Sequence, residues 1–206
     1  MSVTAALRTA EERRTRQRRA RREAILAAAR RVFARNGFDG TTMVDVAREA
    51  GVAAGTVYLY YASKLDLFAA LNARLFEAII GAMRDAQAPP EVRGGTRSRI
   101  HAVFEASREH RDLLRLVFLN PDPRSEVARR MKLAGEERLR PLAELLRAGM
   151  DAGIVGQGDP ALLSRLIVGL VVVALHQCFI EADGREEAAY EDAVVEMIAG
   201  ALTPRN

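Results

Sequence analysis

Residues 41–68 read TTMVDVAREAGVAAGTVYLYYASKLDLF, and this stretch decides the fold of the chain. Thr42 stands at a helix N-cap position with Asp45 three residues later, and apolar residues follow at helical spacing. Gly51 can adopt the left-handed conformation that ends this short helix. A third short helix is predicted over 54–60. The stretch therefore predicts a helix-turn-helix.

The sequence on both sides of this stretch also has helical spacing. Apolar residues of 22–36 recur at i, i+3, i+4, i+7 and i+8, and Asn36-Gly37 ends that helix. Ser63, followed by Asp66, caps a long fourth helix. Further helices are predicted over 96–119, 123–152, 160–182 and 185–202, with N-caps at Asp122 and Asp159 and a kink or break at Pro141. No convincing alternating run of a strand occurs, so the chain is predicted to be all-α.

The charge of this 206-residue chain is divided unevenly. Residues 1–85 hold 15 Arg and Lys against nine Asp and Glu, a net charge of +6, whereas residues 86–206 hold 16 against 18, a net charge of −2. This division favours a polyanionic partner for the front half, although an Arg-rich composition with a solvated tail explains the charge equally well. A sequence motif is needed to choose between a polyanionic partner and a solvated tail.

The sequence also indicates the cellular compartment and the domain boundaries of the chain. A single cysteine, Cys178, excludes a disulfide framework, and no signal peptide is recognisable. The longest apolar run, 166–175, is about half of the roughly 20 residues that span a bilayer. We expect a soluble cytoplasmic protein without a membrane partner. Pro89-Pro90 marks the clearest boundary, which runs on to Gly94-Gly95. The predicted domains are 1–19, an Arg-rich arm, 20–85, a helix-turn-helix domain, and 86–206, a helical domain.

Residues 22–76 resemble the DNA-binding domain of the tetracycline-repressor (TetR) family of transcriptional regulators. The matching stretches are AARRVFARNGF at 28–38, TTMVDVAREAGV at 41–52, GTVYLYY at 55–61 and SKLDLF at 63–68. The resemblance implies a three-helix helix-turn-helix DNA-binding domain joined to an α-helical ligand-binding and dimerisation domain. It implies a repressor that binds a pseudo-palindromic double-stranded DNA operator and is released when a small-molecule effector binds the C-terminal domain.

The resemblance also assigns candidate DNA contacts. Thr42, Tyr60 and Lys64 match phosphate contacts, and Lys64 lies in the first turn of a helix, where free N–H groups favour an anion. The ring of Tyr60 could instead only pack the domain. The residues left to read bases are Ala53, Ala54, Gly55, Thr56 and Tyr58. The chain departs from the family's usual polar residues at Ala53, Ala54 and Leu59, so Thr56 and Tyr58 are expected to carry most direct readout.

The segment 8–22 holds eight arginines, at positions 8, 13, 14, 16, 18, 19, 21 and 22. They either form an extension that enters the minor groove or follows phosphates, or a solvated tail without specific contacts. In both cases we expect the arginines to steepen the salt dependence of DNA binding.

The second half carries two expectations from the family. Its apolar run 166–175 and the stripe on the last helix suit a homodimer formed by the last two helices, although an internal core helix would also explain the run. The effector is unidentified, and a mainly apolar pocket would suit a hydrophobic one. The candidate pocket residues, which core packing explains at least as well, are Phe104, Leu113, Val117, Phe118, Met131, Leu145, Met150 and His176.

The sequence gives little support for a catalytic site or a metal site. His176 and Cys178 point about 200° apart on a helix and cannot share an ion, and the face of His101, Glu105 and Glu109 suits charge pairing better than a metal. No catalytic or cofactor motif is present, so we predict neither an enzyme nor a cofactor. Two rival interpretations stay open: a helical protein–protein module that does not read DNA, and an all-α enzyme that binds a small molecule.

Overall fold

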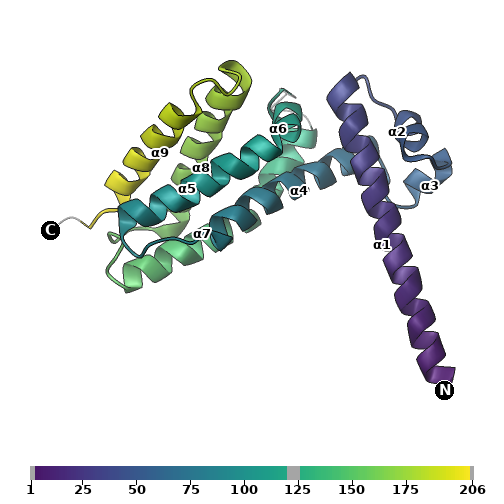
Figure 1. Ribbon diagram of the computed structural model, residues 1–206, viewed down its shortest axis with the longest axis horizontal. Coiled ribbons are helices and arrows are strands. Elements are labelled where there is room, and N and C mark those ends of the chain that lie inside the picture. Colours follow the sequence, from purple (N-terminus) through teal and green to yellow (C-terminus); the bar gives the residue numbers. More distant parts are fainter. Residues whose placement is uncertain (1–2, 120–125, 205–206) are drawn as a thin grey trace. The chain divides into compact units, whose positions relative to one another are not determined.

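The computed structural model describes the backbone of residues 3–119 and 126–204, and the side chains of residues 11–119 and 139–204. Within these ranges every regular element is a helix, which confirms the predicted all-α fold (Figure 1). The chain forms two compact units, residues 1–71 and 72–206. The predicted domain limits after residues 19 and 85 stay predictions.

The first unit is a small bundle built around a shared apolar core. Its helices are α1 (Val3–Asn36), α2 (Met43–Ala50), α3 (Ala54–Tyr58) and the start of α4 (Lys64–Asp85). Three phenylalanine rings meet in its core: Phe33 and Phe38 stack with centroids 5.8 Å apart, and Phe68 meets them edge-on at 5.9 and 5.1 Å. The helices are thereby held together by burial of large apolar side chains.

Helix α1 is longer than the apolar spacing predicts. It runs unbroken from Val3 to Asn36, and the side chains of residues 11–22 are exposed. The segment consists mostly of Arg and Glu, which are strong helix formers, and it contains neither Pro nor Gly. A helix without a buried face has no apolar stripe, so periodicity alone placed its start near Arg22.

In the second unit the helices pack along one another. They are the rest of α4, α5 (Val92–Glu109), α6 (Arg111–Phe118), α7 (Glu126–Asp151), α8 (Pro160–His176), the π-helical turn η1 (Gln177–Glu181) and α9 (Glu187–Leu202). Helix α5 packs along α9, and α7 packs along α8 (Figure 1). The predicted cap at Asp159 is confirmed, since its Oδ1 accepts from the N–H of Ala161 at 2.8 Å and of Leu162 at 3.3 Å.

Several predicted helix limits are wrong in this unit. The single helix predicted over 96–119 is two helices separated at His110, and Gly94-Gly95 lies inside α5 rather than in a linker. Pro141 does not break α7, which continues through it, while the alternative of a kink there stays a prediction. The helix predicted to run to 182 changes to a π-helical turn after His176. The cap predicted at Asp122-Pro123 lies outside the described residues.

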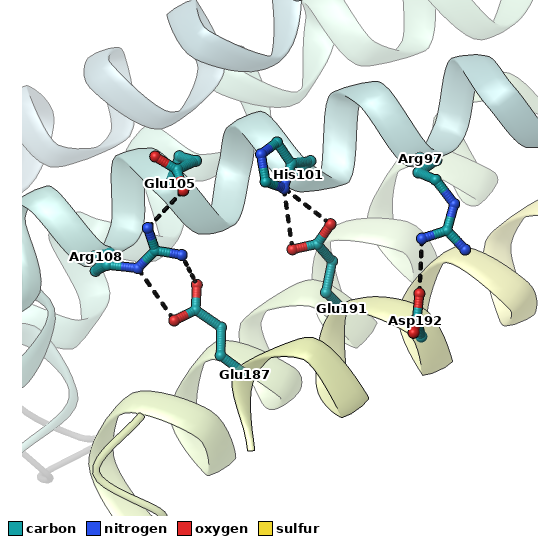
Figure 2. A network of polar contacts seen from close by, with 7 residues as sticks. All are labelled: Arg97, His101, Glu105, Arg108, Glu187, Glu191 and Asp192. Carbon is teal, nitrogen blue, oxygen red and sulfur yellow. Dashed lines mark hydrogen bonds and ion pairs between the residues drawn. The ribbon is translucent and has the colours of Figure 1, made fainter. Parts of the chain in front are cut away.

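A ladder of ion pairs joins α5 to α9 (Figure 2). Arg97 reaches Asp192 at 2.7 Å, and His101 reaches Glu191 at 3.1 Å. Arg108 binds Glu187 at 2.5 Å and also Glu105 on its own helix at 2.5 Å. The hydrogen bonds that Arg108 donates to Glu187 and then to Glu105 raise the pKa of Arg108 above its ordinary value. The charge-paired face predicted at His101 and Glu105 is therefore present, and its partners lie mostly on α9.

Helix α8 exposes large apolar side chains within the single chain. Leu166 and Val173 are each 60% exposed, and Leu162 is half exposed on the same face. The segment Pro160–Glu181 is 22 residues long and is apolar enough to cross a membrane by length and composition alone, because the helix extends beyond the uninterrupted apolar run. A soluble chain would cover such a face with another protein surface.

Candidate nucleic-acid interface and effector cavity

The start of α2 has the cap that the sequence predicts. Thr42 Oγ1 accepts from the N–H of Asp45 at 3.2 Å, and the N–H of Thr42 donates to Asp45 Oδ2 at 3.0 Å, which forms a capping box. The Thr42 hydroxyl and then its N–H lower the pKa of Asp45, which stays ionised and holds the box closed. Thr42 itself is exposed. The start of α2 is thus closed by its own cap, while Thr42 stays accessible from outside.

The turn between α2 and α3 is set by Gly51. Its φ of 65° lies in the left-handed region, and the N–H of Val52 donates to the carbonyl of Ala47 at 3.0 Å, closing a Schellman motif. A residue with a Cβ would be strained here. The next residue that anchors α3 is Val57, which is fully buried. Val57 was not among the residues predicted to matter, although an apolar residue after the small and polar residues 53–56 was a usable signal.

Burial of Val57 leaves the remainder of α3 facing outward. Tyr58 is 53% exposed and Leu59 is 75% exposed. Space also remains open at Gly55, where an added Cβ would meet no atom within 4 Å. The predicted base-reading residues all lie on this short element or at its cap, and they are exposed or half-buried: Ala53, Ala54, Gly55, Thr56 and Tyr58. The element ends at Tyr58, two residues earlier than predicted, and the half-buried Tyr60 follows it.

Lys64 has a structural function that sequence reasoning missed. Its ammonium group donates to the carbonyls of Phe38 at 2.7 Å and Asp39 at 3.3 Å, and it lies 4.5 Å from the centroid of the Phe38 ring. These contacts tie the first turn of α4 to the loop that leads from α1 into α2. Any substitution of Lys64 therefore alters this loop as well as a predicted phosphate contact.

Two arginines of α1 hold α2 through one carboxylate. Arg31 Nε lies 2.6 Å from Glu49 Oε1, and Arg35 Nη2 lies 2.5 Å from Glu49 Oε2. The hydrogen bonds from Arg31 and then Arg35 lower the pKa of Glu49. The i, i+4 spacing of the arginines was visible in the sequence, but their shared partner on another helix was not.

We expect Glu49→Gln to lower the melting temperature at pH 7 by a modest amount, because the pairs are exposed. The folded-state pKa of Glu49 lies below its ordinary value, so its ionised form stabilises the fold at neutral pH and that contribution is lost as the pH falls through the folded pKa. Thermal unfolding followed by circular dichroism should show the difference from the parent narrowing as the pH is lowered. Glu77→Gln, on exposed α4 surface, is the control. A difference that stays constant with pH would contradict this account.

The arginine-rich segment is an exposed part of α1. Seven of its arginines have described side chains and are exposed, those at 13, 14, 16, 18, 19, 21 and 22, while the side chain of Arg8 lies outside the described residues. Arg22 also lies over the ring of Tyr61, with Cζ 5.5 Å from the ring centroid. The segment is helical, which neither of the two sequence-based alternatives anticipated, and its contact with DNA stays a prediction.

The predicted effector residues differ in burial, and their function in a pocket stays a prediction. Phe104, Leu113 and Met150 are buried, and Val117 is half-buried. The rings of Phe118 and His176 contact each other edge-on, with centroids 5.2 Å apart. An apolar cavity of about 320 Å³ lies elsewhere in the second unit, and of these candidates Leu145 lines it. The side chain of Met131 lies outside the described residues.

Cys178 is a buried free thiol. Burial raises its pKa to about 11, so it stays protonated at neutral pH. Among the side chains of residues 11–119 and 139–204, no three His, Cys, Asp or Glu residues are placed to hold a metal ion.

Part of the first unit matches a known family, and most of the chain matches known regulators. Residues 25–71 match the family described as "Bacterial regulatory proteins, tetR family". The transcriptional regulator BetI of Agrobacterium fabrum is 31% identical over 158 residues, which cover 72% of this chain and 75% of BetI. The transcriptional activator FasR of Mycolicibacterium smegmatis is 29% identical over 160 residues, 75% of this chain and 69% of FasR.

The fold is shared with a solved regulator. FadR of Bacillus subtilis, solved in complex with stearoyl-CoA, superposes with a TM-score of 0.71 and 20% identity, covering 87% of this chain and 98% of FadR. Members of the family are soluble DNA-binding regulators that act as dimers, and the relatives named above are transcriptional regulators. With its capped α2, its glycine turn and its exposed α3, the chain belongs to the TetR family of bacterial transcriptional regulators.

Proposed function

We propose that this chain is a cytoplasmic, dimeric transcriptional repressor that leaves a pseudo-palindromic operator when a small-molecule effector binds its C-terminal domain. The observation that carries the proposal is exposure: on α3 Tyr58 is exposed and Thr56 is half-buried, and Thr42 is exposed at the N-cap of α2. A helix with this exposure can enter the major groove while the adjacent N-terminus contacts a phosphate. No catalytic reaction is proposed.

The DNA contacts are divided by chemistry. We assign phosphate contacts to Thr42, Tyr60 and Lys64. Direct base reading falls to the hydroxyls of Thr56 and Tyr58, while Ala54 can contact a thymine methyl group. Ala53 and Gly55 allow the backbone of α3 to approach the groove closely, because neither has a bulky side chain.

The dimer is proposed to form through the exposed apolar faces of α8 and α9. Leu162, Leu166 and Val173 present one face of α8, and Met197 is 60% exposed on α9. The apolar stripe that the sequence offered for the interface on the last helix is instead buried within the single chain, at Val194, Val195, Ile198 and Leu202. Gly169 and Gly200 are exposed on these helices and permit close approach of a second copy. A two-fold dimer places two copies of α3 against two half-sites of an operator. This arrangement covers the apolar helix with a second copy of the chain rather than with lipid.

Thr56→Ala combined with Tyr58→Ala is expected to reduce operator affinity by about thirtyfold or more, since two base contacts of roughly 1–3 kcal/mol each are lost. Both side chains lie on the outer face of α3, so the melting temperature should change little. A mobility-shift titration against the duplex upstream of the chain's own gene measures the loss. Glu77→Ala is the control, and it should bind like the parent.

The outcomes also separate the rival functions. Unchanged affinity in the double variant would overturn the assignment of α3 as the reading helix. Absence of salt-dependent binding to any duplex would favour the protein–protein module. A reporter under the bound promoter gives the direction of regulation: expression rises on deletion of a repressor and falls on deletion of an activator, the activity that the name of FasR states for that protein.

A further inference from the structure

The cavity of about 320 Å³ lies wholly within the second unit. Its wall is formed by the end of α4, the start of α5, the end of α7, and residues of α8 and α9. Most of the lining is apolar, and its aliphatic members include Ile100, Leu146, Val155, Ile167 and Ile198. The volume lies near the lower end of the range of about 300–1,000 Å³ that small-molecule pockets occupy.

One cation interrupts this apolar wall. Arg99 lines the cavity, is only partly exposed, and donates from Nη1 to the carbonyl of Gly95 at 3.0 Å. Burial lowers its pKa, which shows that part of its hydration has been removed without a compensating anion. Among the described side chains no carboxylate lies within 4.0 Å of it. A guanidinium has five N–H donors, so most of its hydrogen-bonding capacity is left for another acceptor.

Arg99 differs in its partners from four other basic residues of α5. Arg93, Arg97, His101 and Arg108 each reach a carboxylate on α9, as Figure 2 shows for the last three. Arg99 lies on a different face of the same helix and turns to the cavity instead. A partly buried charge costs free energy unless it is paired. The unpaired guanidinium is therefore suited to an anion supplied by a ligand.

Local backbone geometry makes room for this arrangement. A Cβ added at Gly95 would lie 2.8 Å from the carbonyl oxygen of Pro89 and 2.9 Å from Nη1 of Arg99. A side chain at this position would displace either the loop before α5 or the guanidinium. Gly95 thus allows the guanidinium to sit against the helix backbone with its remaining donors free.

We propose that this cavity binds a small amphipathic monocarboxylate, with its apolar body among the aliphatic side chains and its carboxylate paired with Arg99. Arg–carboxylate pairs are planar and frequently bidentate, which fixes the orientation of the ligand. Glu91 also lines the cavity and is exposed, so it disfavours a second negative charge on the ligand. This identifies the class of the effector in the proposed function and rests on that function for its regulatory consequence.

The test compares decanoate with 1-decanol, which has the same chain without the charge. Calorimetric titration of the full chain without DNA is expected to show binding of decanoate and at least tenfold weaker binding of decanol, because a hydrogen-bonded charge contributes about 1.5–3 kcal/mol. Arg99→Leu should weaken decanoate by about tenfold to a hundredfold and leave decanol nearly unchanged. Arg185→Leu is the matched control, since Arg185 also donates to a backbone carbonyl but is exposed and away from the cavity.

A second variant tests the location independently of the charge. Leu145→Trp introduces a large ring into the lining and should weaken both decanoate and decanol. Thermal unfolding of each variant establishes that it is folded. The proposal is overturned if the parent binds no decanoate, or if folded Arg99→Leu and Leu145→Trp both bind it like the parent.

Operator binding is measured separately on the ligand-free parent. Operator binding that decanoate weakens supports the cavity as the effector site. Operator binding with no decanoate affinity overturns the ligand class and leaves the proposed repressor intact. Decanoate affinity without binding to any duplex overturns the repressor and leaves the carboxylate site standing.

Discussion

A chain that carries both Leu166→Arg and Val173→Arg is expected to be monomeric and to bind its operator at least about a hundredfold more weakly than the parent, because linked half-sites commonly gain that factor or more over single ones. The two side chains are each 60% exposed in the single chain, on one face of α8. In a two-fold interface each substitution occurs twice, so four large apolar groups are lost. Each contributes about 1.5–3 kcal/mol when fully buried, and the new charges would be buried without partners.

Sedimentation or light scattering gives the mass, and a mobility-shift titration gives the operator affinity. Leu119→Arg is the control, because Leu119 is also a large exposed apolar residue at 57% but lies at the end of α6. The control should remain dimeric. A double variant with the mass of the parent dimer would show that the dimer uses another surface.

Phe33→Ala is expected to lower the free energy of unfolding by about 3–5 kcal/mol, the usual cost of removing a fully buried phenylalanine. Phe33 is 1% exposed and contacts both other rings of the cluster, Phe38 and Phe68. A loss of this size is a large share of the roughly 5–15 kcal/mol that stabilises an ordinary domain. The first unit should then unfold first on warming, and operator binding should fail at the same temperature.

Urea unfolding followed by circular dichroism measures the loss. Phe38→Ala is the matched control, since Phe38 belongs to the same cluster but is only half-buried, and it should cost distinctly less. Equal costs for the two variants would mean that burial does not govern the stability of this cluster.

The sequence predicted an element well where the interactions that form it lie between residues close together in the chain. The caps at Thr42, Ser63 and Asp159 were predicted correctly, and each is made by groups within three residues of one another. The exposed extension of α1 was missed because its helix is stabilised by local propensity without a buried face. The break at His110 was missed because the apolar spacing continues through it from α5 to α6.

The candidate sites also divide into features set by local interactions and features set by tertiary packing. The residues of α3 were assigned to base reading from the family resemblance, and that assignment stays a prediction. Their place directly after the turn was predictable, because Gly51 ends α2 by local turn chemistry. The effector candidates were chosen as apolar residues of the middle helices, and apolar character alone does not separate a cavity wall from a packed core. Phe104 is fully buried, whereas Leu145 lines the cavity, and the two have similar character in the sequence.

By itself, the sequence determined the all-α fold and the helix-turn-helix, because caps, turns and apolar periodicity act between residues close together in the chain. The family followed from the resemblance of residues 22–76. Only the tertiary structure decided which charges are paired. Glu49 lies 18 residues from Arg31, and Arg97 lies 95 residues from Asp192, yet both pairs form. Lys64 was assigned to DNA alone until its contacts with the α1–α2 loop became visible. The isolation of Arg99 in an apolar wall has the same origin, since whether a charge finds a partner depends on which helices pack together.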